Sequence, residues 1–231
     1  MYTAILFDLD GTLIDFDACV RDALRTAFGE LGYEVSDEQI WDEIQAASAE
    51  AGAVYWSQQS ERGWTRAQVM EAVMRDTLAA LGSDTEHPEV PADRYWARFC
   101  KSAHLNPGAH ELLERLQGRF KLGLVTNGEV DSQRGRLHAT GLDVFFDAAI
   151  ISAEVACAKP DPHIFELALE ALGVDAGETL YVGDSFDHDY AGAQSAGIDF
   201  CYYQSDEEEH PELQPALRVR SLAELGDRLL G

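Results

Sequence analysis

Two patterns of hydrophobic and polar positions alternate along most of the chain. Short, almost continuous apolar runs are typical of strands that are buried on both faces of a sheet, and they occur at residues 3–8, 121–125, 148–151, 179–182 and 199–203. Between the later runs, apolar residues recur at the spacing of an amphipathic helix, at residues 107–117, 130–140, 162–172 and 190–196. This order of elements predicts an α/β fold with a doubly wound parallel, Rossmann-like sheet. In such sheets, ligands bind at the carboxyl ends of the strands.

The segment after the first apolar run follows the helical pattern alone. It contains amphipathic stretches but no convincing strand, and helices are predicted at residues 18–31, 37–57, 65–81 and 92–101. The sequence therefore predicts two domains, an α/β core of residues 1–16 and 104–231 and an all-helical insert of residues 17–103. Residues 104–108, His-Leu-Asn-Pro-Gly, have a composition that suits a hinge between them.

Candidate chemistry begins directly after the first predicted strand, at residues 8–12, Asp-Leu-Asp-Gly-Thr. Residues two apart in an extended chain point to the same side, so we expect Asp8 and Asp10 to share one site. Two neighbouring carboxylates raise each other's pKa, so we expect a cation or a shared proton between them, and a bound magnesium ion would remove the conflict. A calcium loop would need further acidic ligands at alternating positions, whereas Leu13 and Ile14 follow here.

Composition restricts the partners. The chain has 231 residues with 46% hydrophobic content and a formal net charge of -25. So much negative charge repels phosphate backbones and anionic lipid, which argues against nucleic-acid polymers and membranes and favours a small substrate. The acidic stretch at residues 205–210 is interpreted as a solvated loop.

The cysteines and the hydropathy predict the compartment. The four cysteines are widely spread without a Cys-x-x-Cys pair, and no signal peptide is evident. No apolar stretch approaches the roughly 20 residues that a membrane helix needs. We therefore expect a soluble cytoplasmic protein, either a monomer or a homodimer.

Four motifs in order resemble those of the haloacid dehalogenase (HAD) superfamily, most of whose members are magnesium-dependent phosphatases. The first is residues 8–12, and the later ones are Leu-Val-Thr-Asn-Gly at 124–128, Ala-Lys-Pro-Asp-Pro at 158–162, and Tyr-Val-Gly-Asp-Ser at 181–185 followed by Asp189. The helical insert resembles the family's cap, which acts as a lid over the site. The stretch from Thr126 to Asp147 looks most similar to pyrimidine 5′-nucleotidases and N-acylneuraminate-9-phosphatases.

The resemblance implies a role for each acidic motif residue. Asp8 would attack the substrate phosphorus and form an aspartyl-phosphate. Asp10 would protonate the leaving group and then activate water, as general acid and base. Magnesium would be bound by Asp8, Asp184 and a backbone carbonyl of Asp10. Asp189 would lie behind them and hold a metal-bound water or Lys159.

The remaining motif residues would bind phosphate. Thr126 can donate its hydroxyl, and Asn127 and Gly128 offer amides just before a predicted helix N-terminus, where anions are favoured. Lys159 would offset the charge of Asp8 and of the transferring phosphoryl group.

The resemblance leaves several functions open. A nucleoside monophosphate or sugar phosphate is the favoured substrate, with phosphoglycolate next. A phosphosugar mutase uses the same motifs, and a catalytically silent binding protein could keep the fold. A dehalogenase attacks carbon without magnesium and usually lacks the second aspartate, so Asp10 argues against it.

Overall fold

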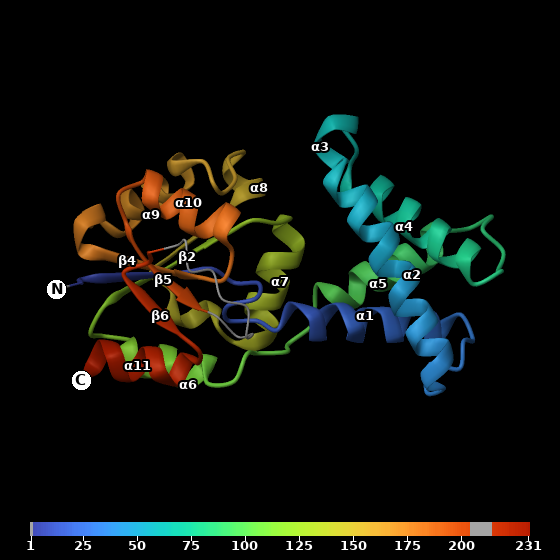
Figure 1. Cartoon of the computed structure of the whole chain (residues 1–231), viewed down its shortest axis with the longest axis horizontal. Helices are drawn as coiled ribbons and strands as arrows, with labels where there is room; N and C mark the ends of the chain where they lie inside the picture. Colours follow the sequence, from blue (N-terminus) through green and yellow to red (C-terminus); the bar gives the residue numbers. More distant parts are fainter. Residues whose placement is uncertain (1, 204–213) are drawn as a thin grey trace. The chain divides into compact units, whose positions relative to one another are not determined.

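The computed structural model describes residues 2–203 and 214–231 (Figure 1). The acidic stretch at residues 205–210 lies outside this part. The chain forms two compact units, which we call the core unit (residues 1–17 and 103–231) and the helical unit (residues 18–102). Each unit is described by itself below.

The core unit is built on a six-stranded sheet in the order β3-β2-β1-β4-β5-β6, in which every neighbouring pair is parallel. The strands are β1 (Ala4–Phe7), β2 (Lys121–Thr126), β3 (Ala148–Ile151), β4 (Thr179–Gly183), β5 (Asp199–Tyr203) and β6 (Leu217–Val219). All four residues of β1 are fully buried, as expected for a central strand covered on both faces. The predicted doubly wound α/β fold is confirmed.

Helices cover both faces of this sheet (Figure 1). α6 (Ala109–Leu116) and α11 (Leu222–Leu230) lie on one side, and α9 (Pro162–Leu172) and α10 (Ala191–Ser195) lie on the other. The unit also contains α7 (Val130–Thr140) and the short α8 (Ser152–Val155). α9 begins where the sequence predicts, because Asp161 accepts a hydrogen bond from the His163 amide and Pro162 occupies the first turn. Its apolar face packs into the core with Leu6 and Val125.

Several segments differ from the sequence-based prediction, among them the short α8, which was not predicted. β6 was not predicted, because it has three residues of which only Val219 is buried, too little for an apolar run. α11 was not predicted either, and the glycine at its centre, Gly226, weakens the helical signal. The helix predicted at residues 190–196 is present as α10 and is one residue shorter at each end; a π-helical segment (Phe186–Tyr190) precedes it.

The helical unit contains the five helices α1 (Phe16–Glu30), α2 (Glu38–Ser57), α3 (Gln59–Arg62), α4 (Arg66–Ala80) and α5 (Glu89–Phe99), of which α1 begins in the core unit. Thr65 and Gln68 form a reciprocal capping box at the start of α4. α2 packs against α4 around Ala51, Val69 and Val73. Among the described residues, no helix has both the length and the apolar composition to cross a membrane.

Candidate active site

The carboxyl ends of three neighbouring strands meet at one edge of the sheet. Phe7, the last residue of β1, is in register with Leu124 of β2 and Val182 of β4. Asp8 continues this register, and its amide donates to the Val182 carbonyl oxygen at 2.9 Å. The sheet therefore places Asp8, the end of β2 and the segment after β4 together, where ligands bind in doubly wound folds.

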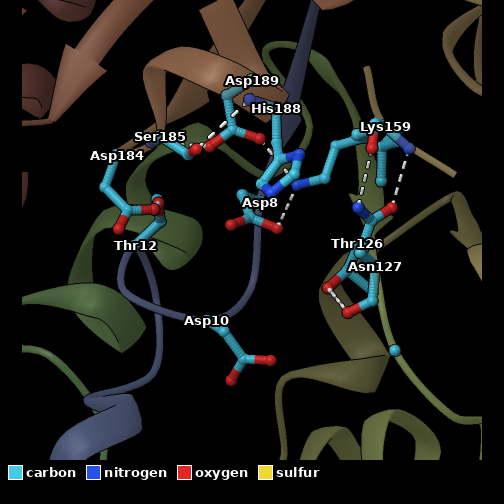
Figure 2. Close-up of polar contacts among 12 residues, drawn as sticks. Asp8, Asp10, Thr12, Thr126, Asn127, Lys159, Asp184, Ser185, His188 and Asp189 are labelled. Carbon is cyan, nitrogen blue, oxygen red and sulfur yellow. Dashed lines mark hydrogen bonds and ion pairs between the residues drawn. The ribbon is translucent and has the colours of Figure 1, made fainter. Parts of the chain in front are cut away.

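Lys159 and Asp8 form a buried ion pair at this edge (Figure 2). The lysine is 5% exposed and the aspartate 6%. The Lys159 Nζ donates to Asp8 Oδ1 at 2.6 Å, to Asp189 Oδ1 at 2.7 Å and to the Tyr181 hydroxyl at 3.0 Å. The ammonium group is thus held by three partners from different segments, and it fixes one oxygen of Asp8.

Three acids gather around this lysine and form a group that can hold a metal ion. Single carboxylate oxygens of Asp8, Asp184 and Asp189 all lie within 4.8 Å of one another. Burial raises the pKa of Asp8 well above its ordinary value; the charge of Lys159 opposes this effect, and Asp189 and Asp184 add to it. Burial, followed by the charge of Asp189, raises the pKa of Asp184 to about 6.

The charge balance of this group fits a divalent cation. Burial by itself would lower the pKa of Lys159, but the carboxylates of Asp8 and Asp189 outweigh it and raise that pKa. The group thus contains one ammonium, that of Lys159, and three carboxylates, those of Asp8, Asp184 and Asp189. Because the ligand atoms are all carboxylate oxygens, the residues present suit a hard ion such as magnesium.

The turn after Asp8 is shaped around Asp184. Gly11 has a φ of +82°, and a Cβ atom there would lie 2.2 Å from Asp184 Oδ2. The Thr12 hydroxyl donates to Asp184 Oδ1 at 3.1 Å. The Asn106 side chain donates to the Gly11 and Thr12 carbonyl oxygens, both at 3.0 Å. The Gly-Thr pair of the first motif thus lets the turn approach Asp184 closely.

The side chains of the second motif bind protein groups. Asn127 accepts from the Lys159 amide at 2.8 Å and donates to the Lys159 carbonyl oxygen at 3.0 Å, so it clamps the backbone of the lysine (Figure 2). The Gly128 amide, predicted to bind phosphate, donates to the Ser152 hydroxyl at 2.9 Å. Thr126 is 1% exposed and its hydroxyl accepts from Gln133 Nε2 at 2.7 Å.

The strand alternation from which we expect Asp8 and Asp10 to share one site does not hold in the structure. β1 ends at Phe7, so the alternation of an extended strand does not apply to residues 8–10. The Asp10 side chain points away from Asp8 and Asp184 (Figure 2). Its carboxylate accepts hydrogen bonds from Arg136 and Gln133 of α7. Asp10 therefore stands apart from the three-acid group.

Three side chains to which the sequence analysis gave no role contact the candidate site residues. Tyr181 is fully buried and its hydroxyl lies 3.0 Å from both Lys159 Nζ and Asp189 Oδ1. Gln133 and Arg136 are 1% exposed on α7. Their three-residue spacing places them on one helix face, which was the signal available in the sequence. For Tyr181 the signal was a hydroxyl between two apolar residues, Leu180 and Val182.

Comparisons with known proteins identify the class to which this fold and site belong. Residues 2–197 match the family of haloacid dehalogenase-like hydrolases. The chain belongs to this family, as its motifs indicate, and it is a hydrolase of HAD type.

Relatives match over nearly the whole chain. The HAD-hydrolase YfnB of Bacillus subtilis is 31% identical in sequence, over 97% of this chain and 94% of the YfnB chain. The crystal structure of YfnB bound to magnesium superposes with a TM-score of 0.84 and 29% identity, and the match covers 100% of this chain and 99% of that chain. The pyrimidine 5′-nucleotidase YjjG of Escherichia coli is 32% identical over 96% of this chain and 95% of the YjjG chain. A 2-haloacid dehalogenase of Pseudomonas syringae, 24% identical with a TM-score of 0.69 over 99% and 98%, shares the fold. The resemblance to HAD enzymes and their pyrimidine 5′-nucleotidases is confirmed.

Magnesium is expected to stabilise the protein more at about pH 7.5 than at about pH 5. The pKa of Asp184 is raised from 3.8 to about 6, so the folded protein retains a proton that the unfolded chain has lost. Without metal, this group makes stability fall as the pH rises from about 4 to about 6. Metal binding requires the ionised carboxylate and therefore gains with rising pH.

Thermal unfolding at the two pH values, with magnesium or with a chelator, measures both effects. The Asp184→Asn variant is the matched control, and it should lose most of the magnesium-dependent shift at both pH values. An equal magnesium shift at both pH values in the unaltered protein would contradict the prediction.

Proposed function

We propose that the protein is a magnesium-dependent phosphomonoester hydrolase that acts through an aspartyl-phosphate on Asp8. The observation that carries this proposal is the buried Asp8 carboxylate, ion-paired to Lys159 at 2.6 Å and grouped with Asp184 and Asp189 within 4.8 Å. A buried carboxylate that has one oxygen held by a lysine and that belongs to a group able to bind a metal ion is well placed to act as a nucleophile toward phosphorus.

In the first half-reaction, Asp8 attacks the phosphorus, and the bond to the leaving alkoxide breaks. To act as the acid, Asp10 would have to carry a proton and leave its hydrogen bonds with Arg136 and Gln133; it would then give that proton to the alkoxide, which departs as an alcohol. In an in-line displacement the attacking and leaving oxygens lie on opposite sides of the phosphorus. The group that serves the leaving oxygen must therefore stand apart from Asp8, as Asp10 does (Figure 2).

In the second half-reaction, water attacks the aspartyl-phosphate from the side that the alcohol has left. Asp10, now ionised, takes a proton from this water; inorganic phosphate forms and the Asp8 carboxylate is restored. Asp8, Asp184 and the Asp10 backbone carbonyl would hold a magnesium ion, which would supply positive charge to the phosphoryl oxygens. Lys159 contributes a fixed ammonium group to the same charge.

The other residues support these groups. We assign the Thr126 hydroxyl to a phosphoryl oxygen: Gln133 donates to its oxygen, and its hydrogen would exchange a long contact with the Asn127 carbonyl oxygen, at 3.4 Å, for the phosphate. Asn127 fixes the backbone of Lys159 from both sides. The Gly128 amide would have to exchange its contact with Ser152 to reach a phosphate. Asp189 holds Lys159 through a second buried ion pair, at 2.7 Å.

The favoured substrate is a small phosphorylated metabolite, a nucleoside monophosphate or a sugar phosphate. The similarity to a pyrimidine 5′-nucleotidase over almost the whole chain supports the first class. A dehalogenase function is disfavoured, because its attack on carbon needs neither the second aspartate nor the three-acid group that this chain possesses.

Phosphate release from a panel of substrates tests the proposal. The panel contains nucleoside monophosphates, sugar phosphates and phosphoglycolate, each assayed with magnesium and with a chelator, and 2-haloacids assayed for halide release. We expect phosphate release that requires magnesium and is fastest with one of the first two classes. Halide release, or phosphate release that persists in chelator, would contradict the proposal.

A further inference from the structure

The side chain of Asn106 holds the turn that follows β1. Its Nδ2 donates to the carbonyl oxygens of Gly11 and Thr12, both at 3.0 Å, and so uses both of its hydrogens. The Asn106 backbone amide also donates to the Leu13 carbonyl oxygen at 2.9 Å. One residue therefore fixes three successive carbonyl groups of the turn.

The Asp10 carbonyl group is the exception in this turn. The Leu9 carbonyl oxygen accepts from the Leu13 and Ile14 amides, at 2.9 Å each, and the Ile14 carbonyl oxygen accepts from the Gly11 amide at 2.9 Å. Among the residues that the structure describes, none donates a hydrogen bond to the Asp10 carbonyl oxygen. Because a trans peptide group is planar, the Gly11 amide that points at Ile14 turns the Asp10 carbonyl oxygen to the opposite side. The turn thus leaves this oxygen able to act as a ligand.

The residues that Asn106 holds are also those that contact Asp184. Gly11 lies so close to it that an added Cβ atom would come within 2.2 Å of Asp184 Oδ2. Thr12 is fully buried, and its hydroxyl donates to Asp184 Oδ1 at 3.1 Å. A displacement of the turn would therefore move the Asp10 carbonyl group and weaken the support of the Asp184 carboxylate at the same time.

We propose that Asn106 is a positioning residue for the magnesium site. This inference rests on the proposed function, in which Asp8, Asp184 and the Asp10 backbone carbonyl would hold the ion. Asn106 is not a ligand in this assignment; it acts through the carbonyl groups of Gly11 and Thr12. Magnesium requires near-ideal octahedral geometry, so a small shift of one ligand oxygen weakens its binding.

The rival interpretation is a purely structural asparagine that joins two segments of the core unit. The Asp15 amide donates to the His104 carbonyl oxygen at 3.0 Å, and Ile14 forms an antiparallel bridge with Leu105, so residues 104–106 pair with residues 13–15. Loss of a structural residue would lower the fraction of folded protein, and with it the number of magnesium sites. The molecules that remain folded would keep their affinity.

Calorimetric titration with magnesium alone, at about pH 7.5, separates the interpretations, because it measures the dissociation constant and the number of sites independently. Asn106→Leu keeps nearly the same volume and removes the donor. We expect its magnesium dissociation constant to rise about 10- to 100-fold, the typical cost of removing a group that orients a metal ligand. Calcium accepts a more flexible coordination, so its dissociation constant should rise by a smaller factor.

Gln117→Met is the matched control for this experiment. Gln117 is exposed and precedes β2, and its side-chain amide also donates to a backbone carbonyl oxygen, that of Val144, at 3.4 Å. Both dissociation constants should stay unchanged in this variant. Asn106→Ala removes the donor without filling its space, and its magnesium dissociation constant should rise as well. Circular dichroism and thermal unfolding check each variant; if Asn106→Leu fails to fold, Asn106→Ala decides in the same way.

An unchanged magnesium dissociation constant in the folded Asn106 variants, or an equal rise for both cations, would overturn the assignment of Asn106. An unaltered protein that binds no magnesium would overturn this inference and the proposed function together. An unaltered protein that binds magnesium but hydrolyses no phosphomonoester would overturn the proposed function, and the titration would still decide the role of Asn106.

Discussion

Replacing Asp8 with asparagine is expected to abolish turnover while the protein stays folded. The substitution exchanges one oxygen for an amino group of nearly the same size, so the packing around the end of β1 is kept. An amide does not attack phosphorus, and loss of a covalent nucleophile typically costs an enzyme at least about 10⁴-fold in kcat. Phosphate release with magnesium present measures the activity, and circular dichroism with thermal unfolding measures the fold.

Asp187→Asn is the matched control for this experiment. Asp187 is an exposed acid on the segment after β4 and lies outside the group formed by Asp8, Asp184 and Asp189. Its replacement removes one negative charge from the same region, so we expect activity close to that of the unaltered protein. If Asp8→Asn kept activity within about tenfold, catalysis would proceed without the aspartyl-phosphate, by water acting directly on the substrate.

Strands that are buried on both faces were the most predictable part of the fold. β1, β2 and β4 lie at the centre of the sheet and are almost entirely apolar, so length and composition suffice to locate them. At the edge of the sheet this signal is lost. β6 buries one residue of three, and its pairing with β5 depends on a tertiary contact that no local pattern encodes.

The positions of the acids were predictable only where the strand register fixes them. β1 and β4 are neighbouring parallel strands, and Asp8 and Asp184 follow their carboxyl ends. Because each acid directly follows a predicted strand, the sequence alone was enough to expect both at one edge of the sheet. The direction of Asp10 depends instead on the turn at Gly11 and on Arg136, which lies 126 positions further along the chain. Contacts across such a separation are set by the packing of α7, and a single sequence does not reveal them.

Replacing Lys159 with methionine is expected to remove activity and to lower the free energy of unfolding by about 3–5 kcal/mol in the absence of magnesium. Methionine fills a similar volume but leaves the carboxylates of Asp8 and Asp189 buried without their cation, and breaking a buried ion pair on one side costs about this much. The deficit should grow with pH, because acids whose pKa is raised in the folded state lose stability as the pH rises. Denaturant unfolding at about pH 6 and about pH 8 measures it.

Two further variants test whether the missing charge of Lys159 causes this loss of stability. Lys121→Met alters a lysine at the opposite end of the sheet, whose amine contacts the Leu172 carbonyl oxygen, and it should cost less than about 1 kcal/mol. Adding Asp189→Asn to Lys159→Met removes one of the two buried carboxylates that have lost their cation. This double variant should recover stability without recovering activity, and the double-mutant cycle measures the coupling between the two residues.

Magnesium should reduce the loss of stability in Lys159→Met, because a bound cation compensates the same carboxylates. A Lys159→Met protein as stable as the unaltered one at about pH 8 without metal would show that these acids are neutralised by protons rather than by the lysine.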